Sequence, residues 1–85
     1  MNDVPFKIVT KYNKLLQERE ELVGRIAALE NNYSILTDQY MEGIIRGPIG
    51  KTQRKLSNER TKCINKVAKL DRELANLRGK YRLPR

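Results

Sequence analysis

Hydrophobic residues recur every seventh position through the first half of the chain. If the leucines are placed at heptad position d, position a carries mainly tyrosine and isoleucine, and a third apolar row follows at e. The d row is Ile8, Leu15, Leu22, Leu29 and Leu36, the a row is Tyr12, Arg19, Ile26, Tyr33 and Tyr40, and the e row is Val9, Leu16, Val23 and Ile44. A pattern sustained over more than four heptads predicts a long coiled-coil helix, and the third row favours a bundle of more than two helices.

The second half of the chain repeats the pattern. Its d row is Leu56, Cys63, Leu70 and Leu77, and its a row is Arg60, Val67, Leu74 and Tyr81, with Ile64 at e. Cys63 is interpreted as a small buried hydrophobic residue, and the tyrosines at a as amphipathic core residues. The arginines at a, Arg19 and Arg60, each require a carboxylate or an exit to solvent. We interpret them as register devices whose carboxylates can come from a partner chain.

These rows predict an all-α chain of two long heptad helices joined by a turn rich in glycine and isoleucine. The first helix is expected to start between Pro5, a good first-turn residue, and Thr10, a candidate cap. Thr52 is the candidate cap of the second helix, and Gly79 is its candidate stop. The two helices can fold back as a hairpin, but a hairpin leaves the e row uncovered. We therefore expect partner helices in a multi-chain bundle or coiled coil. The expected divisions are an N-terminal helix over 1–43, the turn over 44–51, a basic helix over 52–79 and a tail over 80–85.

Composition narrows the class of protein. The 85 residues suffice for one small domain, and 33% of them are charged. Histidine is absent and there is one cysteine, which removes the commonest general base and excludes a zinc site built within the chain. We expect no enzyme, no cofactor and no small-molecule ligand. A single cysteine fits the nucleus or cytosol. Neither a secretory signal nor a membrane span is expected, because no apolar run approaches about 20 residues.

The formal net charge of +8 is unevenly distributed. Residues 1–43 contain five Lys and Arg against seven Asp and Glu, whereas residues 44–85 contain thirteen against three. The first half therefore carries −2 and the second half +10. A solvated face, an acidic partner helix and weak contact with DNA or a nucleosome all remain open as explanations. Lys62, Lys66 and Lys69 are the candidates for phosphate contact, with an affinity that is independent of sequence and lost with salt.

The stretch MEGIIRGPIGKT between the two helices ends like a phosphate-binding loop. That motif requires a glycine five positions before Gly50, and the residue there is Ile45. No strand precedes the stretch, so nucleotide binding is not expected. A plain hinge accounts for the glycines and for Pro48, but not for the isoleucines. Ile44 and Ile45 therefore suggest a small hydrophobic plug, anchored by Arg46, that docks into a pocket.

The same region resembles a known family. Tyr33, Thr37 and Tyr40, followed by Gly43-Ile44-Ile45-Arg46-Gly47 after a leucine-rich helix, resemble the signature of the Esa-associated factor six family. Its members are small accessory subunits of MYST-type histone acetyltransferase complexes. The resemblance covers roughly residues 12–47. The chain departs from the family pattern at Glu42-Gly43 and at Pro48, where an aromatic residue is usual.

The resemblance implies a nuclear, non-catalytic subunit that regulates chromatin and transcription. Its expected partners are helices of a scaffold subunit and of an inhibitor-of-growth type subunit. The expected partner-binding residues are Leu15, Leu22, Ile26, Leu29, Tyr33, Leu36, Tyr40, Ile44, Ile45 and Arg46. Two other classes stay open: a self-assembling structural coiled coil and a basic helical nucleic-acid-binding protein.

Overall fold

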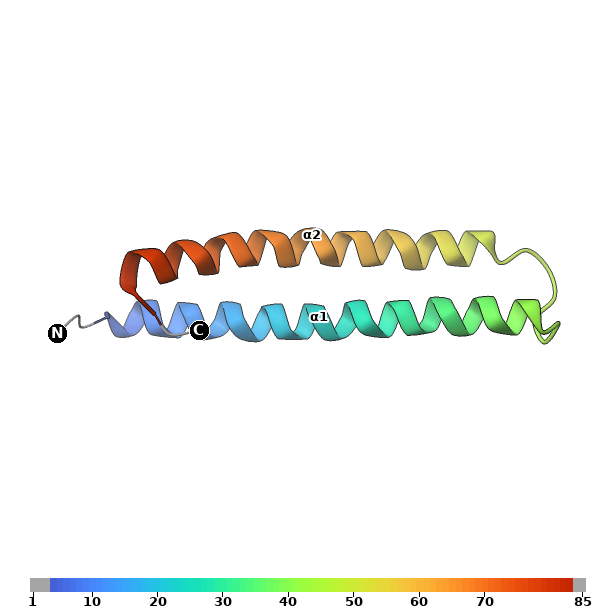
Figure 1. The fold of residues 1–85 in the computed structure, drawn as a ribbon, viewed down its shortest axis with the longest axis horizontal. Helices are drawn as coiled ribbons and strands as arrows, with labels where there is room; N and C mark the ends of the chain where they lie inside the picture. The colour runs from blue at the N-terminus through green and yellow to red at the C-terminus, as the bar shows by residue number, and fades with distance from the viewer. Residues whose placement is uncertain (1–3, 84–85) are drawn as a thin grey trace.

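The computed structural model describes residues 4–83 and shows two long antiparallel helices lying side by side (Figure 1). Helix α1 spans Phe6–Met41 and helix α2 spans Gly50–Tyr81. The hairpin is 64 Å long and only 16 × 15 Å in cross-section. The prediction of an all-α chain with two heptad helices joined by a turn is confirmed.

Helix α1 begins at the early end of the expected interval, so Thr10 lies inside the helix and does not cap it, and the helix ends in a glycine turn. Pro5 is the N-cap, and its carbonyl accepts hydrogen bonds from the backbone N–H groups of Ile8 and Val9. At the other end Gly43 adopts a φ of 76°. The N–H of Gly43 donates to the Tyr40 carbonyl, while the next N–H along the chain donates to Gln39. These two bonds form a Schellman motif, which satisfies carbonyls that the helix end leaves unpaired.

Helix α2 is longer at both ends than the sequence suggested. Its N-cap is Ile49, which makes no side-chain capping bond, so Thr52 lies inside the helix and does not cap it. Gly79 does not stop the helix, which continues for two more residues to Tyr81. Arg82 closes it in the left-handed conformation, with its N–H donating to the Arg78 carbonyl at 2.8 Å.

The core is a single seam between the helices. Its buried side chains all occupy a or d positions and are Tyr12, Leu15, Leu29, Cys63, Leu70 and Leu74. Leu74 is the most deeply buried, at 1% exposed. Cys63 is buried as a free thiol, which confirms its interpretation as a small hydrophobic residue. Because two helices enclose only one such row, few side chains are fully removed from water.

Polar contacts fix how the helices are aligned. Four contacts cross the seam on one side of the hairpin: Tyr12 with Arg78, Arg19 with Asp71, Glu30 with Arg60, and Thr37 with Gln53. Moving along α1 from one contact to the next always requires an equal step back along α2. The two helices therefore keep one register along their shared length, as antiparallel helices with matched heptads do.

Candidate protein-interaction surface

The heptad residues expected to bind a partner are used largely within the chain itself. Leu15 and Leu29 are buried against α2, while Leu22, Ile26 and Leu36 are half-buried. The a/d seam of α1 thus packs against α2. What remains accessible to another chain lies beside this seam.

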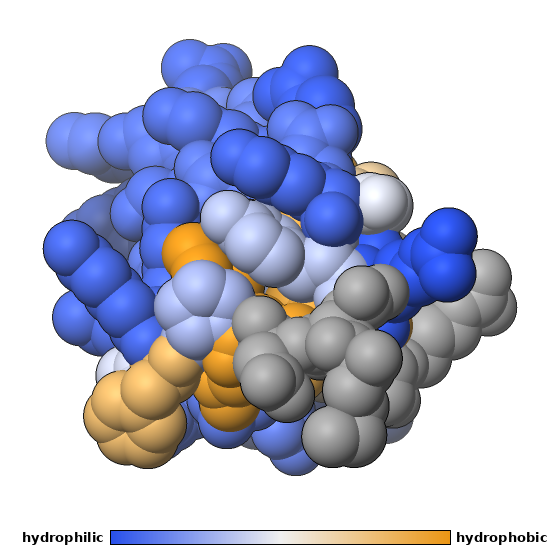
Figure 2. Space-filling model, turned by 90° about the vertical axis from the view of Figure 1, so that its left-hand side faces the viewer, coloured by the Kyte–Doolittle hydropathy of each residue, from blue (hydrophilic) through white to orange (hydrophobic). Residues whose placement is uncertain are grey.

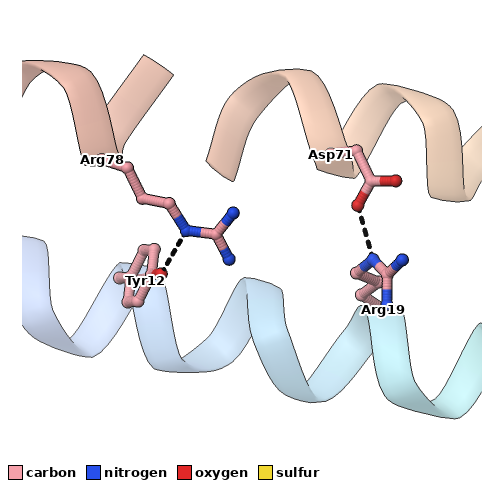
Figure 3. A network of polar contacts seen from close by, with 4 residues as sticks. All are labelled: Tyr12, Arg19, Asp71 and Arg78. Atoms are coloured by element: carbon pink, nitrogen blue, oxygen red, sulfur yellow. Dashed lines mark hydrogen bonds and ion pairs between the residues drawn. The ribbon is translucent and has the colours of Figure 1, made fainter. Parts of the chain in front are cut away.

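The carboxylates that the seam arginines need also come from this chain. Arg19 leaves the seam and donates through Nε to Asp71 of α2 (Figure 3). Arg60 of α2 does the same in the opposite direction and pairs with Glu30 of α1 at 3.2 Å. The expectation that a partner supplies these carboxylates is therefore not needed. Their side chains remain about half exposed, so each arginine lays its apolar stem along the seam and keeps its charge in water.

Tyr12 shows how a tyrosine fits at position a. Its ring is buried, and its hydroxyl accepts a hydrogen bond of 2.7 Å from Nε of Arg78 (Figure 3). The same guanidinium lies 5.7 Å from the centre of the ring. The aromatic body is therefore in the core while its polar end is satisfied at the edge.

The two long sides of the hairpin differ in chemistry. Successive helical residues are about 100° apart, so positions e and b lie beside a, whereas g and c lie beside d. The g/c side carries mostly charged residues on both helices. The e/b side, which we call the apolar face, carries in its apolar and small positions Phe6, Val9, Leu16, Val23, Ala27, Met41, Ile64, Ala68 and Ala75. Within residues 4–83, most of the exposed hydrophobic surface beside the seam lies on this second side, whereas the g/c side exposes the single large apolar residue Ile35.

The centre of the apolar face lies midway along the hairpin. Val23 is 43% exposed and Ile64 is 38% exposed. The register places Ile64 across from the half-buried Ile26, one turn from Val23. The Arg19–Asp71 pair lies on one side of this centre and the Glu30–Arg60 pair on the other. A small apolar patch framed by ion pairs is the usual arrangement of a protein contact site.

A groove of about 280 Å³ opens next to that centre, towards the turn. It is lined by Leu29, Glu30, Tyr33, Leu56, Ser57 and Arg60. Leu29 and Leu56 come from d positions, so the groove is a stretch of seam that the two helices do not close. Tyr33 stands at its edge, 39% exposed, although the heptad pattern assigns it to the core. The groove can therefore accept an apolar side chain from outside.

The turn between the helices leaves one of its isoleucines largely exposed to solvent. Ile44 is 66% exposed, Ile45 is half-buried, and Arg46 is exposed. Tyr40 and Met41, just before the turn, are exposed as well. Nothing in the described part of the chain receives Ile44. Ile44 is therefore available for docking, as the plug hypothesis requires.

The lysines of α2 lie in a row that the sequence reasoning missed. The heptad pattern leaves them outside a and d but does not by itself show that they share one helix face. Lys51, Lys55, Lys62, Lys66 and Lys69 all fall within about 60° of one another around the axis. All five are exposed. The last turns of α2, beyond this row, are also largely hydrophilic in the view onto the end of the hairpin where α1 begins and α2 ends (Figure 2).

Within residues 4–83 no helix is long and apolar enough to cross a membrane. The same described residues contain no group of three or more acidic, cysteine or histidine side chains placed to hold a metal ion. Comparison of the chain with protein-family models, with curated proteins and with solved structures finds no match. The resemblance around Tyr33 and Gly43 therefore rests on those residues themselves.

Proposed function

We propose that this chain is a non-catalytic scaffold subunit that assembles with helices of other proteins through its apolar face. The exposed apolar centre formed by Val23, Ile26 and Ile64 carries the proposal. The open groove at Tyr33 lies on the same side of the hairpin, just beyond the Glu30–Arg60 pair, and this side carries fewer charged residues than the other. A third helix packed there would cover apolar surface that two helices leave in water.

The distance between the apolar centre and the groove indicates what kind of helix would fit this face. The centre at Ile26 and the groove at Tyr33 are seven residues apart, which is about 10 Å along a helix. A partner helix with two large apolar side chains one heptad apart would fill both. The ion pairs beside the centre favour a partner with polar residues flanking those two anchors. Such a helix packs along the hairpin and forms a three-helix bundle.

The sequence resemblance supplies candidate partners. Under this proposal the helix belongs to the scaffold subunit of a MYST-type histone acetyltransferase complex, with an inhibitor-of-growth type subunit in the same assembly. The protein would then act in the nucleus as a chromatin regulator without catalysis of its own. The exposed turn at Ile44, Ile45 and Arg46, which belongs to the resembling stretch, would provide a second contact with the same assembly.

Affinity purification of the tagged chain from its own cells, followed by mass spectrometry, tests the proposal. The wild-type chain is expected to recover the acetyltransferase, scaffold and inhibitor-of-growth type subunits together. Val23→Asp places a charge in the apolar centre and should abolish this recovery, because Val23 contributes little to the hairpin core. Ile35→Asp is the matched control, since Ile35 is also exposed but occupies position c on the other side of α1. Recovery of unrelated proteins alone would refute the acetyltransferase assignment, and equal recovery by both variants would refute the apolar face.

A second function remains in competition because the same face also suits a second copy of this chain. Two hairpins packed through their apolar faces would form a four-helix bundle, which is the arrangement expected of a self-assembling structural protein. The two possibilities differ in mass. A stable homodimer of the purified chain at micromolar concentration, with no other protein recovered from cells, would favour self-assembly.

A further inference from the structure

The lysine row of α2 provides a separate surface from the apolar face. Its members are Lys51, Lys55, Lys62, Lys66 and Lys69, with Asn58 filling the one gap in the spacing. From Lys51 to Lys69 the row spans 18 residue steps, about 27 Å of helix. It points away from α1 by roughly a third of a turn from the seam, so packing within the hairpin does not cover it.

Neutralising charges are unevenly placed along this row. Residues 43–58 contain Arg46, Lys51, Arg54 and Lys55 and no acidic residue. The first acidic side chain beyond them is Glu59, whose carboxylate is already paired with Arg25 at 2.9 Å. At the other end, Lys66 and Lys69 share a hollow with Glu18 and Glu73. The positive potential is therefore concentrated on the half of the row that adjoins the turn.

That half contains an open hollow of about 700 Å³. Its lining consists of Lys51, Thr52, Arg54, Lys55, Asn58, Glu59 and Lys62, without any apolar residue. Protein interfaces are depleted in lysine at their centre and depend on aromatic or aliphatic anchors, which are absent here. Lysine, arginine, threonine and asparagine are instead the side chains that contact phosphate oxygens.

We propose that this part of α2, centred on Lys51, Lys55 and Lys62, binds the phosphate backbone of double-stranded DNA without reading its sequence. The shape of the hairpin sets the mode of binding. A body 16 × 15 Å in cross-section does not enter a major groove about 12 Å wide. The helix rests on the phosphates along the duplex, and its row of about 27 Å covers most of one helical turn. The proposal does not depend on the apolar face, which lies elsewhere on the hairpin.

Salt-dependent binding tests this proposal with the full-length chain and a random-sequence 30-base-pair duplex. Binding of wild-type protein is measured by fluorescence anisotropy between 25 and 200 mM salt. The triple variant Lys51→Gln/Lys55→Gln/Lys62→Gln is compared with Lys7→Gln/Lys11→Gln/Lys14→Gln on α1. Both variants lose the same charge from exposed helical positions, so net charge alone affects them equally. Circular dichroism of each variant establishes that the helices remain.

The α2 variant is expected to bind about tenfold or more weakly than the α1 variant. Its slope of log K against log salt should be shallower than that of the wild type by about 2 to 3, since each phosphate contact contributes about 0.9. A duplex of different sequence should give the same affinity. Equal losses in the two variants would show that net charge alone is responsible. Polyglutamate, measured in the same way, serves as a model of an acidic protein. If the α2 variant loses binding to polyglutamate while its DNA binding is unchanged, the row belongs to an acidic protein partner. Either result overturns the proposal.

Discussion

Arg19 of α1 and Asp71 of α2 form an ion pair across the hairpin, although Arg19 occupies a position that the heptad pattern reserves for the core. The Glu30–Arg60 pair repeats the arrangement with the helices exchanged. A slip of α2 by one heptad would place either Ile64 or Arg78 opposite Arg19, and neither can replace the carboxylate. The pairs thus contribute more to the choice of register than to stability, which fits their half-exposed position.

The stability lost when one charge of this pair is reversed should be recovered when the second charge is reversed as well. Arg19→Glu places two carboxylates across the seam and should lower the free energy of unfolding by about 1 kcal/mol. Adding Asp71→Arg restores an attractive pair in the same geometry and should return most of that loss. Urea unfolding followed by circular dichroism measures both variants. If the two changes simply add, the residues are not coupled and the register assigned here is wrong.

The buried end of the seam should be the most sensitive part of the hairpin. Leu74→Ala removes a side chain that is only 1% exposed, and the cavity left behind should cost about 2–4 kcal/mol. Val23→Ala is the control, because Val23 is 43% exposed and contributes little to the intrachain core. Thermal or urea unfolding should therefore separate the two variants clearly. Similar losses would mean that Val23 is buried in solution, for instance by self-association.

The sequence was sufficient to predict the seam, because the residues buried between the helices all come from the a and d rows. It did not show which chain would cover that seam, since a heptad pattern marks the side of a helix that is buried without identifying its mate. Leu15 and Leu29 were therefore expected to contact a partner but pack against α2. The acceptors of Arg19 and Arg60 were missed for the same reason.

The ends of α2 and the arrangement of its lysines also differ from the sequence-based expectation, each for a local reason. Thr52 and Gly79 were expected to bound the second helix, but neither residue prevents helical backbone, and packing against α1 continues past both. The heptad pattern excludes the lysines from a and d but does not by itself show that they share one face. Counting 100° per residue from Lys51 places Lys55, Lys62, Lys66 and Lys69 on one face, and this signal was present in the sequence.

Glycines in different backbone conformations should respond in opposite directions to alanine. Gly24 lies within α1, and a β-carbon there would meet nothing within 4 Å, so Gly24→Ala should stabilise the hairpin by about 0.5–1 kcal/mol. Gly47 has a φ of 98°, which alanine adopts only with strain, so Gly47→Ala should destabilise by about 1 kcal/mol or more. Differential unfolding measurements compare the two. A stabilising Gly47→Ala would show that the turn adopts another conformation in solution.

The isolated chain should be helical but should associate weakly as concentration rises. The reason is the apolar face, where the hairpin covers Val23 and Ile64 only in part and leaves them 43% and 38% exposed. Sedimentation velocity over a hundredfold range of concentration should show the shift, and Val23→Lys/Ile64→Lys should suppress it while leaving the circular dichroism unchanged. A sharply unfolding monomer at every concentration would argue against a need for partners.

The turn should contribute directly to partner binding. Changing Ile44 and Ile45 together to serine should weaken partner binding while the helical signal is retained, because Ile44 is 66% exposed and both residues lie outside α1 and α2. Burial of an isoleucine contributes about 1.5–3 kcal/mol, so loss of both can reduce affinity by a hundredfold or more. The single variant Ile44→Ser removes only the exposed side chain and should give an intermediate affinity, whereas Ile35→Ser should bind like the wild type. Isothermal titration against the scaffold helix recovered by affinity purification provides the measurement. Wild-type affinity in the double variant would mean that the turn only connects the two helices, and that the apolar face alone makes the contact.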